Sequence, residues 1–333
     1  MQSFWQTLKK PIIGLAPMDG ITDYPMRQIQ VEIKKPDVMY TEFISVEGFS
    51  KNSQKLLKKL FYKENERPII AQIFGYTPEL YPNVIEKISK LGFDGIDINM
   101  GCPAKSVLQK GGGAALIGNF SLAEKIISNS LAYLDEISTE KKQRQIPLSI
   151  KTRIGKNEKE TTDWFSFLSN FPISAVVIHG RPLSKGHSGM IDWEKIKMST
   201  EILKKKGIIV LGNGGVKSLK EAEEKCNYYN LNGILIGQAA LGNPWVFILR
   251  GKSPGATESR SFTYQPSKRE LLNTILNHAK LAWDFYGEKG FSSVKKHFGW
   301  YPKGFINSKE LKLSLLRAGN IEEVKKIIKD NFD

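Results

Sequence analysis

The sequence predicts an α/β protein: a (β/α)8 barrel, the TIM-barrel architecture, followed by a small all-helical domain. Three observations support this. Eight short apolar segments recur between residue 11 and about residue 240, helical patterns separate them, and only helical patterns follow residue 270. Strands covered on both faces are continuously apolar, and eight strand and helix units fit the length of such a barrel. An open, doubly wound sheet is the alternative for the same pattern.

The eight predicted strands are rich in β-branched residues and end at Gly, Asn, Pro or a charged residue. They span residues 11–18, 38–43, 68–75, 95–101, 147–155, 175–181, 207–215 and 233–238. A barrel of parallel strands carries its chemistry at the carboxyl ends of the strands. We therefore expect the functional residues at these ends.

Helix starts between the strands are predicted from capping residues. Residues 78–91 place apolar side chains on one face, with Thr77 as the expected N-cap. Ser121 and Ser218 are each followed three residues later by a glutamate, which is the spacing of a capping box.

The pattern changes after the barrel. We expect residues 1–250 to form the barrel domain and residues 251–270, which are polar and rich in Gly, Ser and Pro, to form a linker or crossover. Amphipathic patterns at 270–286 and 321–328 then predict a helical domain over residues 271–333.

Composition indicates an ordinary globular protein, with 41% hydrophobic and 25% charged residues among 333. No apolar run approaches the roughly 18 residues that span a bilayer, and the first residues lack the apolar stretch of a secretory signal, so we expect a cytoplasmic protein without membrane contact. Cys102 and Cys226 are too few for a disulfide framework and lack metal-ligand spacing, so no metal is expected.

The net charge of +15 favours a polyanionic partner such as nucleic acid, although solubility alone is a competing explanation. Residues 250–333 contain 16 Lys or Arg and nine Asp or Glu. Within them, segment 292–305 interleaves Lys295 and Lys296 with aromatic residues, a combination that suits stacking on bases and neutralising phosphates. The alternative is that the aromatic residues fill the domain core and the lysines face water.

The end of the fourth predicted strand is the most informative segment. Cys102 follows it directly, and the run Gly111, Gly112 and Gly113 allows a loop that approaches or closes over a ligand. A lone cysteine is more often a buried small residue, and Cys226, inside a predicted helix, keeps that interpretation.

The other strand ends supply polar and cationic groups. Lys151 and Arg153 alternate on the fifth strand, as His179 and Arg181 do on the sixth, so each pair points to one face. Gln72 on the third strand adds an amide that could read a flavin or a base edge. Exposure to solvent is the competing explanation for each of them.

Glycines end the last two predicted strands, in GNGG (212–215) and GQ (237–238). The corresponding loops of such barrels commonly bind phosphate through backbone N–H groups, which small residues leave accessible. Glycine turns also end strands for purely conformational reasons, so the signal is moderate.

Six motifs, taken in order, resemble the tRNA-dihydrouridine synthase family over roughly residues 10–250. They are APMDGITD (16–23), DINMGCPAKSV (97–107), IKTR (150–153), IHGR (178–181), GNGG (212–215) and GQAALGNPW (237–245). The resemblance implies a flavin-binding TIM barrel with a helical RNA-binding domain. It also implies an oxidoreductase that reduces uridine in tRNA to 5,6-dihydrouridine, with FMN as cofactor and NADPH or NADH as reductant.

The resemblance assigns roles residue by residue. Cys102 corresponds to the proton donor, Asn99 to a uracil contact, and Arg181 to an arginine near the base or the flavin. Lys295 and Lys296 are the expected RNA contacts of the tail. The family's FMN contacts fall on Pro17, Met18, Asp19, Gln72, Lys151, His179, Asn213, Gly214, Gly215, Gly237 and Gln238.

Two positions depart from the family pattern. Gly215 stands where the family usually has Asp, and Gln238 where it often has Arg. Backbone contacts to phosphate would survive both changes, whereas the lost arginine charge is expected to weaken FMN retention. The expected partners are tRNA and NAD(P)H, and the expected state is a monomer.

Two other functions remain open at this point. One is a flavin barrel that acts on a free pyrimidine, in the manner of dihydroorotate dehydrogenases, and the basic tail argues against it. The other is a non-enzymatic RNA-binding barrel that has lost its flavin.

Overall fold

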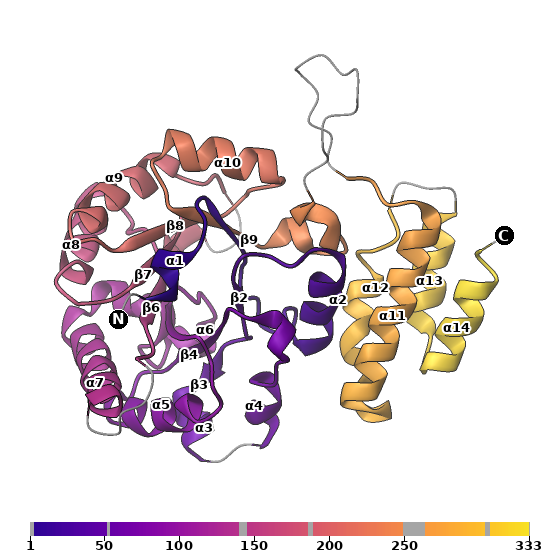
Figure 1. The fold of residues 1–333 in the computed structure, drawn as a ribbon, viewed down its shortest axis with the longest axis horizontal. Helices are drawn as coiled ribbons and strands as arrows, with labels where there is room; N and C mark the ends of the chain where they lie inside the picture. The colour runs from indigo at the N-terminus through magenta and orange to yellow at the C-terminus, as the bar shows by residue number, and fades with distance from the viewer. Residues whose placement is uncertain are drawn as a thin grey trace.

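The computed structural model describes residues 3–51, 54–139, 145–185, 189–248, 264–303 and 307–332. Within them, nine parallel strands form one sheet with the neighbour order β1-β9-β8-β7-β6-β5-β4-β2, and β3 pairs with β4. A bridge between Gly14 and Val38 joins β1 to the other edge of the sheet, so the barrel is nearly closed. The predicted barrel is confirmed, with helices around it and further helices at the C-terminal end (Figure 1).

Each of the eight predicted segments contains a strand. The strands are β1 (Ile12–Leu15), β2 (Met39–Tyr40), β3 (Ile44–Ser45), β4 (Ile69–Phe74), β5 (Gly95–Met100), β6 (Leu148–Arg153), β7 (Ala175–His179), β8 (Ile209–Asn213) and β9 (Gly233–Ile236). In predicted segment 38–43 the strand ends at Tyr40, and β3 begins only at Ile44, outside the segment. Between these two strands the carboxylate of Glu42 accepts a hydrogen bond from the backbone N–H of Gly20 and forms an ion pair with Lys59.

Helices and short 3-10 turns connect the strands. The helices are α1 (Phe4–Thr7), α2 (Tyr24–Lys34), α3 (Val46–Ser50), α4 (Gln54–Lys59), α5 (Tyr81–Ser89), α6 (Lys105–Leu108), α7 (Phe120–Thr139), α8 (Glu158–Leu168), α9 (Trp193–Lys204) and α10 (Leu219–Tyr228). The 3-10 turns are η1 (Glu64–Glu66), η2 (Pro78–Leu80), η3 (Gly113–Gly118), η4 (Leu183–Lys185), η5 (Gln238–Ala240) and η6 (Pro244–Phe247). None of the helices in the described ranges is long and apolar enough to cross a membrane.

The predicted caps have different outcomes. Ser218 caps α10 by accepting the backbone N–H of Glu221, as predicted. The prediction at Ser121 is wrong, because α7 already begins at Phe120 and the side chain of Asn119 accepts the N–H of the first turn. Thr77 precedes the 3-10 turn η2, but its side chain makes no capping hydrogen bond.

Apolar side chains alternate between two cores of the barrel. Ile13 and Leu15 of β1 pack outward against the surrounding helices, whereas Ile12 joins a smaller cluster of alternate strand residues. Trp5 of α1 is fully buried in that smaller cluster. Alternate strand residues therefore belong either to the interior cluster or to the core beneath the helices.

A third core belongs to the C-terminal helices. They are α11 (Lys268–Tyr286), η7 (Glu288–Val294), α12 (Lys295–Phe298), α13 (Ser308–Arg317) and α14 (Ile321–Lys329). Ser267 and Glu270 form a capping box at the start of α11. Of the predicted linker, residues 251–263 lie outside the described residues.

The C-terminal helices pack on the barrel through α2, which lies beside α11 (Figure 1). The rings of Tyr24 and Phe285 lie 4.8 Å apart between centroids. The hydroxyl of Tyr286 donates to the Oδ2 atom of Asp23 at 3.1 Å. Trp245, which follows the last barrel strand, is a member of the C-terminal core. The two parts of the chain therefore share a packed junction.

Candidate functional site

The strand ends place the predicted polar residues at matching levels of the sheet. In the register of β5 and β6, Asn99 lies opposite Lys151. Across β6 and β7, Arg153 lies opposite His179, and His179 in turn lies opposite Asn213 of β8. The barrel thus gathers residues that are far apart in sequence into one rim.

The loop after β5 holds Cys102 in a fixed position. The Oδ1 atom of Asn99 accepts the backbone N–H groups of Gly101 and Cys102 at 3.0 and 2.9 Å. The Nε atom of Arg153 donates to the carbonyl of Gly101 at 2.7 Å. Gly113 closes against this loop with a φ of +58°, and a Cβ there would lie 2.7 Å from the carbonyl oxygen of Cys102. A glycine is therefore required at residue 113.

Cys102 is 7% exposed, and its thiol lies among charged groups. Burial raises its pKa above the ordinary value, and Asp19 raises it further, while Arg153 and Lys151 lower it. The thiol is therefore protonated at neutral pH. By contrast, Cys226 lies within α10, where burial raises its pKa to about 12.

Below Cys102, a chain of hydrogen bonds runs through the barrel interior. The Nδ2 atom of Asn99 donates to the Oε1 atom of Gln72 at 3.0 Å, and the Nε2 atom of Gln72 donates to Asp97 at 2.8 Å. The hydroxyl of Ser149 donates to the other oxygen of Asp97 at 2.7 Å. Burial raises the pKa of the Asp97 carboxyl to about 6.

Sequence reasoning gave Asp97 no role, although the alternation of β5 was a usable signal. Asp97 lies two residues before Asn99, so both side chains lie on the same face of the strand. A carboxylate on that face of a buried strand needs hydrogen-bonding partners, and here they are the predicted site residues.

Cations concentrate on β6 and just after β7. Burial and the neighbouring Arg153 lower the pKa of Lys151 to about 8. Burial and the nearby Arg181 lower the pKa of Arg153 to about 10. The Nε atom of Arg181 donates to the carbonyl of Gly189 at 2.9 Å. Like charges this close favour the binding of an anion between or above them.

The turn after β1 is held by ionic contacts. The ammonium of Lys59 lies 2.5 Å from Asp19 and 3.2 Å from Glu42. Glu42 also accepts the backbone N–H of Gly20 at 2.6 Å. In the same turn Pro17 is buried, and Met18 is partly buried. Local sequence patterns could not indicate Lys59, because it lies 40 residues from Asp19.

The loop after β8 has a backbone conformation that favours glycine. Gly214 and Gly215 have φ angles of +122° and +71°. A Cβ on Gly214 would lie 2.6 Å from Ile191 and 3.4 Å from the Nε2 atom of His179. Before them, Asn213 donates its side-chain N–H to the carbonyl of Leu235 at 2.8 Å. Ile191 thus fills the space beside Gly214, and the conformation of this loop requires glycine.

The loop after β9 lies against the turn after β1. A Cβ on Gly237 would lie 3.6 Å from the sulfur of Met18 and 3.4 Å from Ala16. The next residue, Gln238, is exposed and begins η5. Because β1 and β9 are neighbours, the FMN contacts predicted at residues 17–19 and at residues 237–238 lie side by side.

The C-terminal helices contribute one cation to the same rim. A Cβ on Gly20 would lie 3.4 Å from the Nζ atom of Lys296, so this lysine of α12 reaches the turn after β1. Lys295 is partly exposed on the same helix. Phe298 and Tyr301 are 0% and 4% exposed, so these two aromatic residues fill the core, as the alternative interpretation stated.

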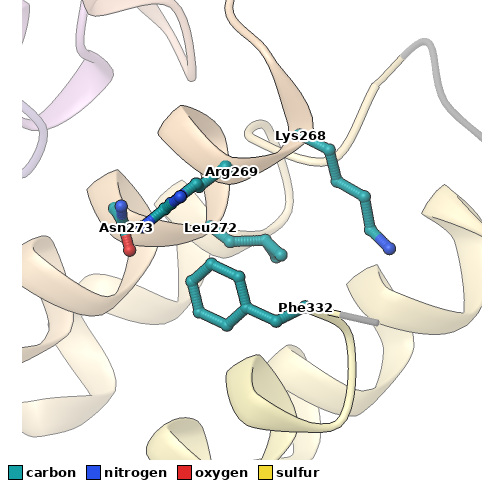
Figure 2. A pocket seen from close by; sticks show the side chains of 5 residues that line it. All are labelled: Lys268, Arg269, Leu272, Asn273 and Phe332. Carbon is teal, nitrogen blue, oxygen red and sulfur yellow. The ribbon is translucent and has the colours of Figure 1, made fainter.

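A separate hollow of about 520 Å³ lies in the C-terminal helices. The first turns of α11 and the side chain of Phe332 form its wall (Figure 2). It contains none of the predicted site residues. Lys268 and Arg269, two of its lining residues, add positive charge to this part of the surface.

Comparisons with known proteins agree with this geometry. A family model described as dihydrouridine synthase (Dus) matches residues 14–331. A Staphylococcus aureus (strain COL) protein named "Probable tRNA-dihydrouridine synthase" is 29% identical over 339 residues, covering 100% of this chain and 96% of the relative. A Bacillus subtilis (strain 168) protein named "Probable tRNA-dihydrouridine synthase 2" is 28% identical over 338 residues, covering 99% of this chain and 96% of the relative.

Two solved structures share the fold. The structure of DHODH from Eimeria tenella in complex with ferulenol aligns with a TM-score of 0.50 and 10% identity, covering 68% of this chain and 75% of that one. An old yellow enzyme homologue from Zymomonas mobilis aligns with a TM-score of 0.50 and 11% identity, covering 70% of this chain and 86% of that one. At this identity the likeness concerns the fold.

Proposed function

Because the chain belongs to the dihydrouridine synthase family, we propose that it is a flavin-dependent oxidoreductase that reduces specific uridines of tRNA to 5,6-dihydrouridine. The observation that carries the proposal is the position of Cys102 at the barrel rim, on a loop that Asn99 and Arg153 hold by hydrogen bonds. Burial raises the pKa of its thiol, which favours a proton donor. A proton donor and cations at one place suit a reaction that adds a proton to carbon while negative charge develops on oxygen.

The proposed cofactor is FMN, and two features of the rim fit it. Gly214 and Gly215 follow β8 with positive φ angles and carry no side chains beside their backbone N–H groups, as a loop that binds phosphate through its main chain requires. Burial and neighbouring cations lower the pKa values of Lys151 and Arg153, so an anionic cofactor bound beside them would favour their charged forms.

The residues proposed to hold FMN surround that rim. When bound and reduced by NADPH or NADH, FMN supplies the hydride for C6 of the uracil. The Gln72 amide is oriented by Asp97 and Asn99, and Lys151 provides charge beside it. The full proposed set is Pro17, Met18, Asp19, Gln72, Lys151, His179, Asn213, Gly214, Gly215, Gly237 and Gln238.

Cys102 is the proposed proton donor to C5. Its raised pKa keeps the thiol protonated at neutral pH, and the backbone contacts of Asn99 and Arg153 fix the loop that carries it. Addition of hydride to C6 places enolate-like charge on C5 and the C4 oxygen. Arg153, Arg181 or the second N–H of the Asn99 amide can stabilise that oxygen while the thiol delivers its proton.

The RNA-binding surface is proposed to include the C-terminal helices. A target base must leave its stack, at a cost of a few kcal/mol, and contacts to phosphates offset that cost. Lys296 lies beside the rim at Gly20, with Lys295 next to it on α12, so phosphates flanking an extruded uridine would meet both. We further propose that the protein is a cytoplasmic monomer.

The proposal is tested with the purified full chain, FMN, NADPH and unmodified tRNA transcripts. We expect a flavin absorption spectrum and one or more dihydrouridines per tRNA by mass spectrometry. Turnover of free uracil or orotate without RNA would instead assign a free-pyrimidine reductase. A protein that binds tRNA but stays colourless after FMN is added would contradict enzymatic function.

A further inference from the structure

Three potential metal ligands converge at the junction between the barrel and the C-terminal helices. They are Asp23 at the N-cap of α2, His278 in α11 and His297 in α12. Each offers one ligand atom, and these atoms all lie within 4.8 Å of one another. The residues are 5%, 1% and 2% exposed, so the cluster is closed to bulk solvent.

Two of the three residues have outer partners that orient them. Asp23 accepts the backbone N–H of Met26 on one oxygen and the hydroxyl of Tyr286 on the other, both at 3.1 Å. The Nδ1 atom of His278 lies 2.9 Å from the hydroxyl of Tyr301. Metal-binding histidines and carboxylates characteristically have such partners on the atoms that do not face the metal.

The third residue points independently to a ligand. The Nε2 atom of His297 is buried and has no hydrogen-bond partner within the described residues. A buried polar atom without a partner is costly and requires an explanation. The ring of His297 lies 4.5 Å from that of His278 between centroids, with Asp23 close to both. A metal ion bound among the three residues would give the Nε2 atom of His297 the partner it lacks.

We propose that Asp23, His278 and His297 bind one divalent transition-metal ion. Two imidazole nitrogens and a carboxylate oxygen suit Zn²⁺, with a water in the fourth position. Zinc bonds of about 2.0–2.2 Å would draw together ligand atoms that now lie within 4.8 Å of one another. The proposal is independent of the function proposed for the barrel rim.

The ion would connect the two parts of the chain. Its ligands come from α2 on the barrel side and from α11 and α12 on the other, and Lys296, next to His297, reaches the turn after β1. The bound metal would therefore fix the position of α12 over the rim. Spacing along the sequence could not indicate this site, because Asp23 and His278 are 255 residues apart.

The test uses the full chain, stripped with a chelator and titrated with Zn²⁺ or with Co²⁺ as a visible probe. We expect one equivalent to bind and the Co²⁺ complex to show the intense visible bands of a tetrahedral site. H278Q and H297Q should bind at least about 100-fold more weakly. The control D284N, which alters an exposed carboxylate of α11, should bind like the unaltered chain.

Equal binding by the unaltered chain and H297Q, or less than one equivalent on the unaltered chain, would overturn the proposal. Circular dichroism checks that the variants fold. If both histidine variants unfold, X-ray absorption of the zinc-loaded unaltered chain decides the question. Two imidazoles in the first coordination sphere would support the site, and oxygen ligands alone would rule it out.

Discussion

The side-chain oxygen of Asn99 accepts a hydrogen bond from the backbone N–H of Cys102, at 2.9 Å. The same amide donates to Gln72, which donates to Asp97 inside the barrel. The loop that carries the thiol is therefore connected to the buried interior through three side chains.

Replacing Cys102 by alanine should slow tRNA reduction by roughly 100- to 10,000-fold, the usual scale for loss of a general acid. Flavin and tRNA affinities should stay close to those of the unaltered chain, because the alanine keeps the backbone contacts to Asn99. Single-turnover oxidation of the reduced flavin by tRNA measures the effect. C226A, a change in a buried cysteine of α10, is the control, and near-normal turnover by C102A would remove Cys102 from the mechanism.

Replacing Asp97 by asparagine should change how stability depends on pH. The folded-state pKa of about 6 lies above the ordinary 3.8, so the stabilising contribution of protonated Asp97 is complete below pH 4 and is lost as pH rises through 6. Relative to the unaltered chain, D97N should gain up to about 3 kcal/mol of unfolding free energy between pH 4 and 7.

Urea unfolding at several pH values measures this difference, provided that both chains unfold in two states. The exposed carboxylate of Asp135 on α7 supplies the control, since D135N should follow the unaltered chain. A D97N difference that stays constant from pH 4 to 7 would contradict the raised pKa.

Replacing Gly214 by alanine should weaken FMN binding by about tenfold or more, because the new Cβ meets Ile191 and the φ angle of +122° disfavours a side chain. Fluorescence titration of the stripped chain with FMN gives the affinity. G207A separates the two causes, since Gly207 also has a positive φ but has open space around it. If both variants lose FMN equally, the effect is general destabilisation.

Replacing Lys296 by alanine should weaken tRNA binding and reduce the slope of log affinity against log salt by about 1, the loss of one phosphate contact. Reduction of the flavin by NADPH, which needs no RNA, should be unaffected. K325A on α14 provides a lysine control at a helix distant from the rim. An unchanged salt slope for K296A would place Lys296 outside the RNA contact.

Much of the fold was predictable because its signals are local. Continuous apolar segments marked every strand except the short β3, and the amphipathic tail marked α11 and α14. The exceptions have tertiary causes. In segment 38–43 the strand ends before Glu42, which binds Gly20 and Lys59, and α7 is capped by Asn119 rather than Ser121.

The rim residues were predictable for a different reason. In the barrel, each lies in the carboxyl-terminal half of a strand or shortly after one, and a parallel barrel brings all such positions to one end. What the sequence could not reveal were contacts made by chain closure, such as Lys59 with Asp19, or His278 with His297 and Asp23. Local patterns also could not show that Tyr301 packs inward while Lys296 extends to the barrel.

The membership of Trp245 in the C-terminal core has a practical consequence for hybrid enzymes. The carbonyl of its neighbour Pro244 accepts a hydrogen bond from Gln30 of α2. This short segment therefore contacts both the C-terminal core and the barrel. A graft of a relative's tail at residue 251 would leave a native indole facing a foreign packing surface. A hybrid whose boundary lies before Pro244, and whose α2 comes from the same relative as the tail, would keep all the contacts between α2, Trp245 and the C-terminal helices.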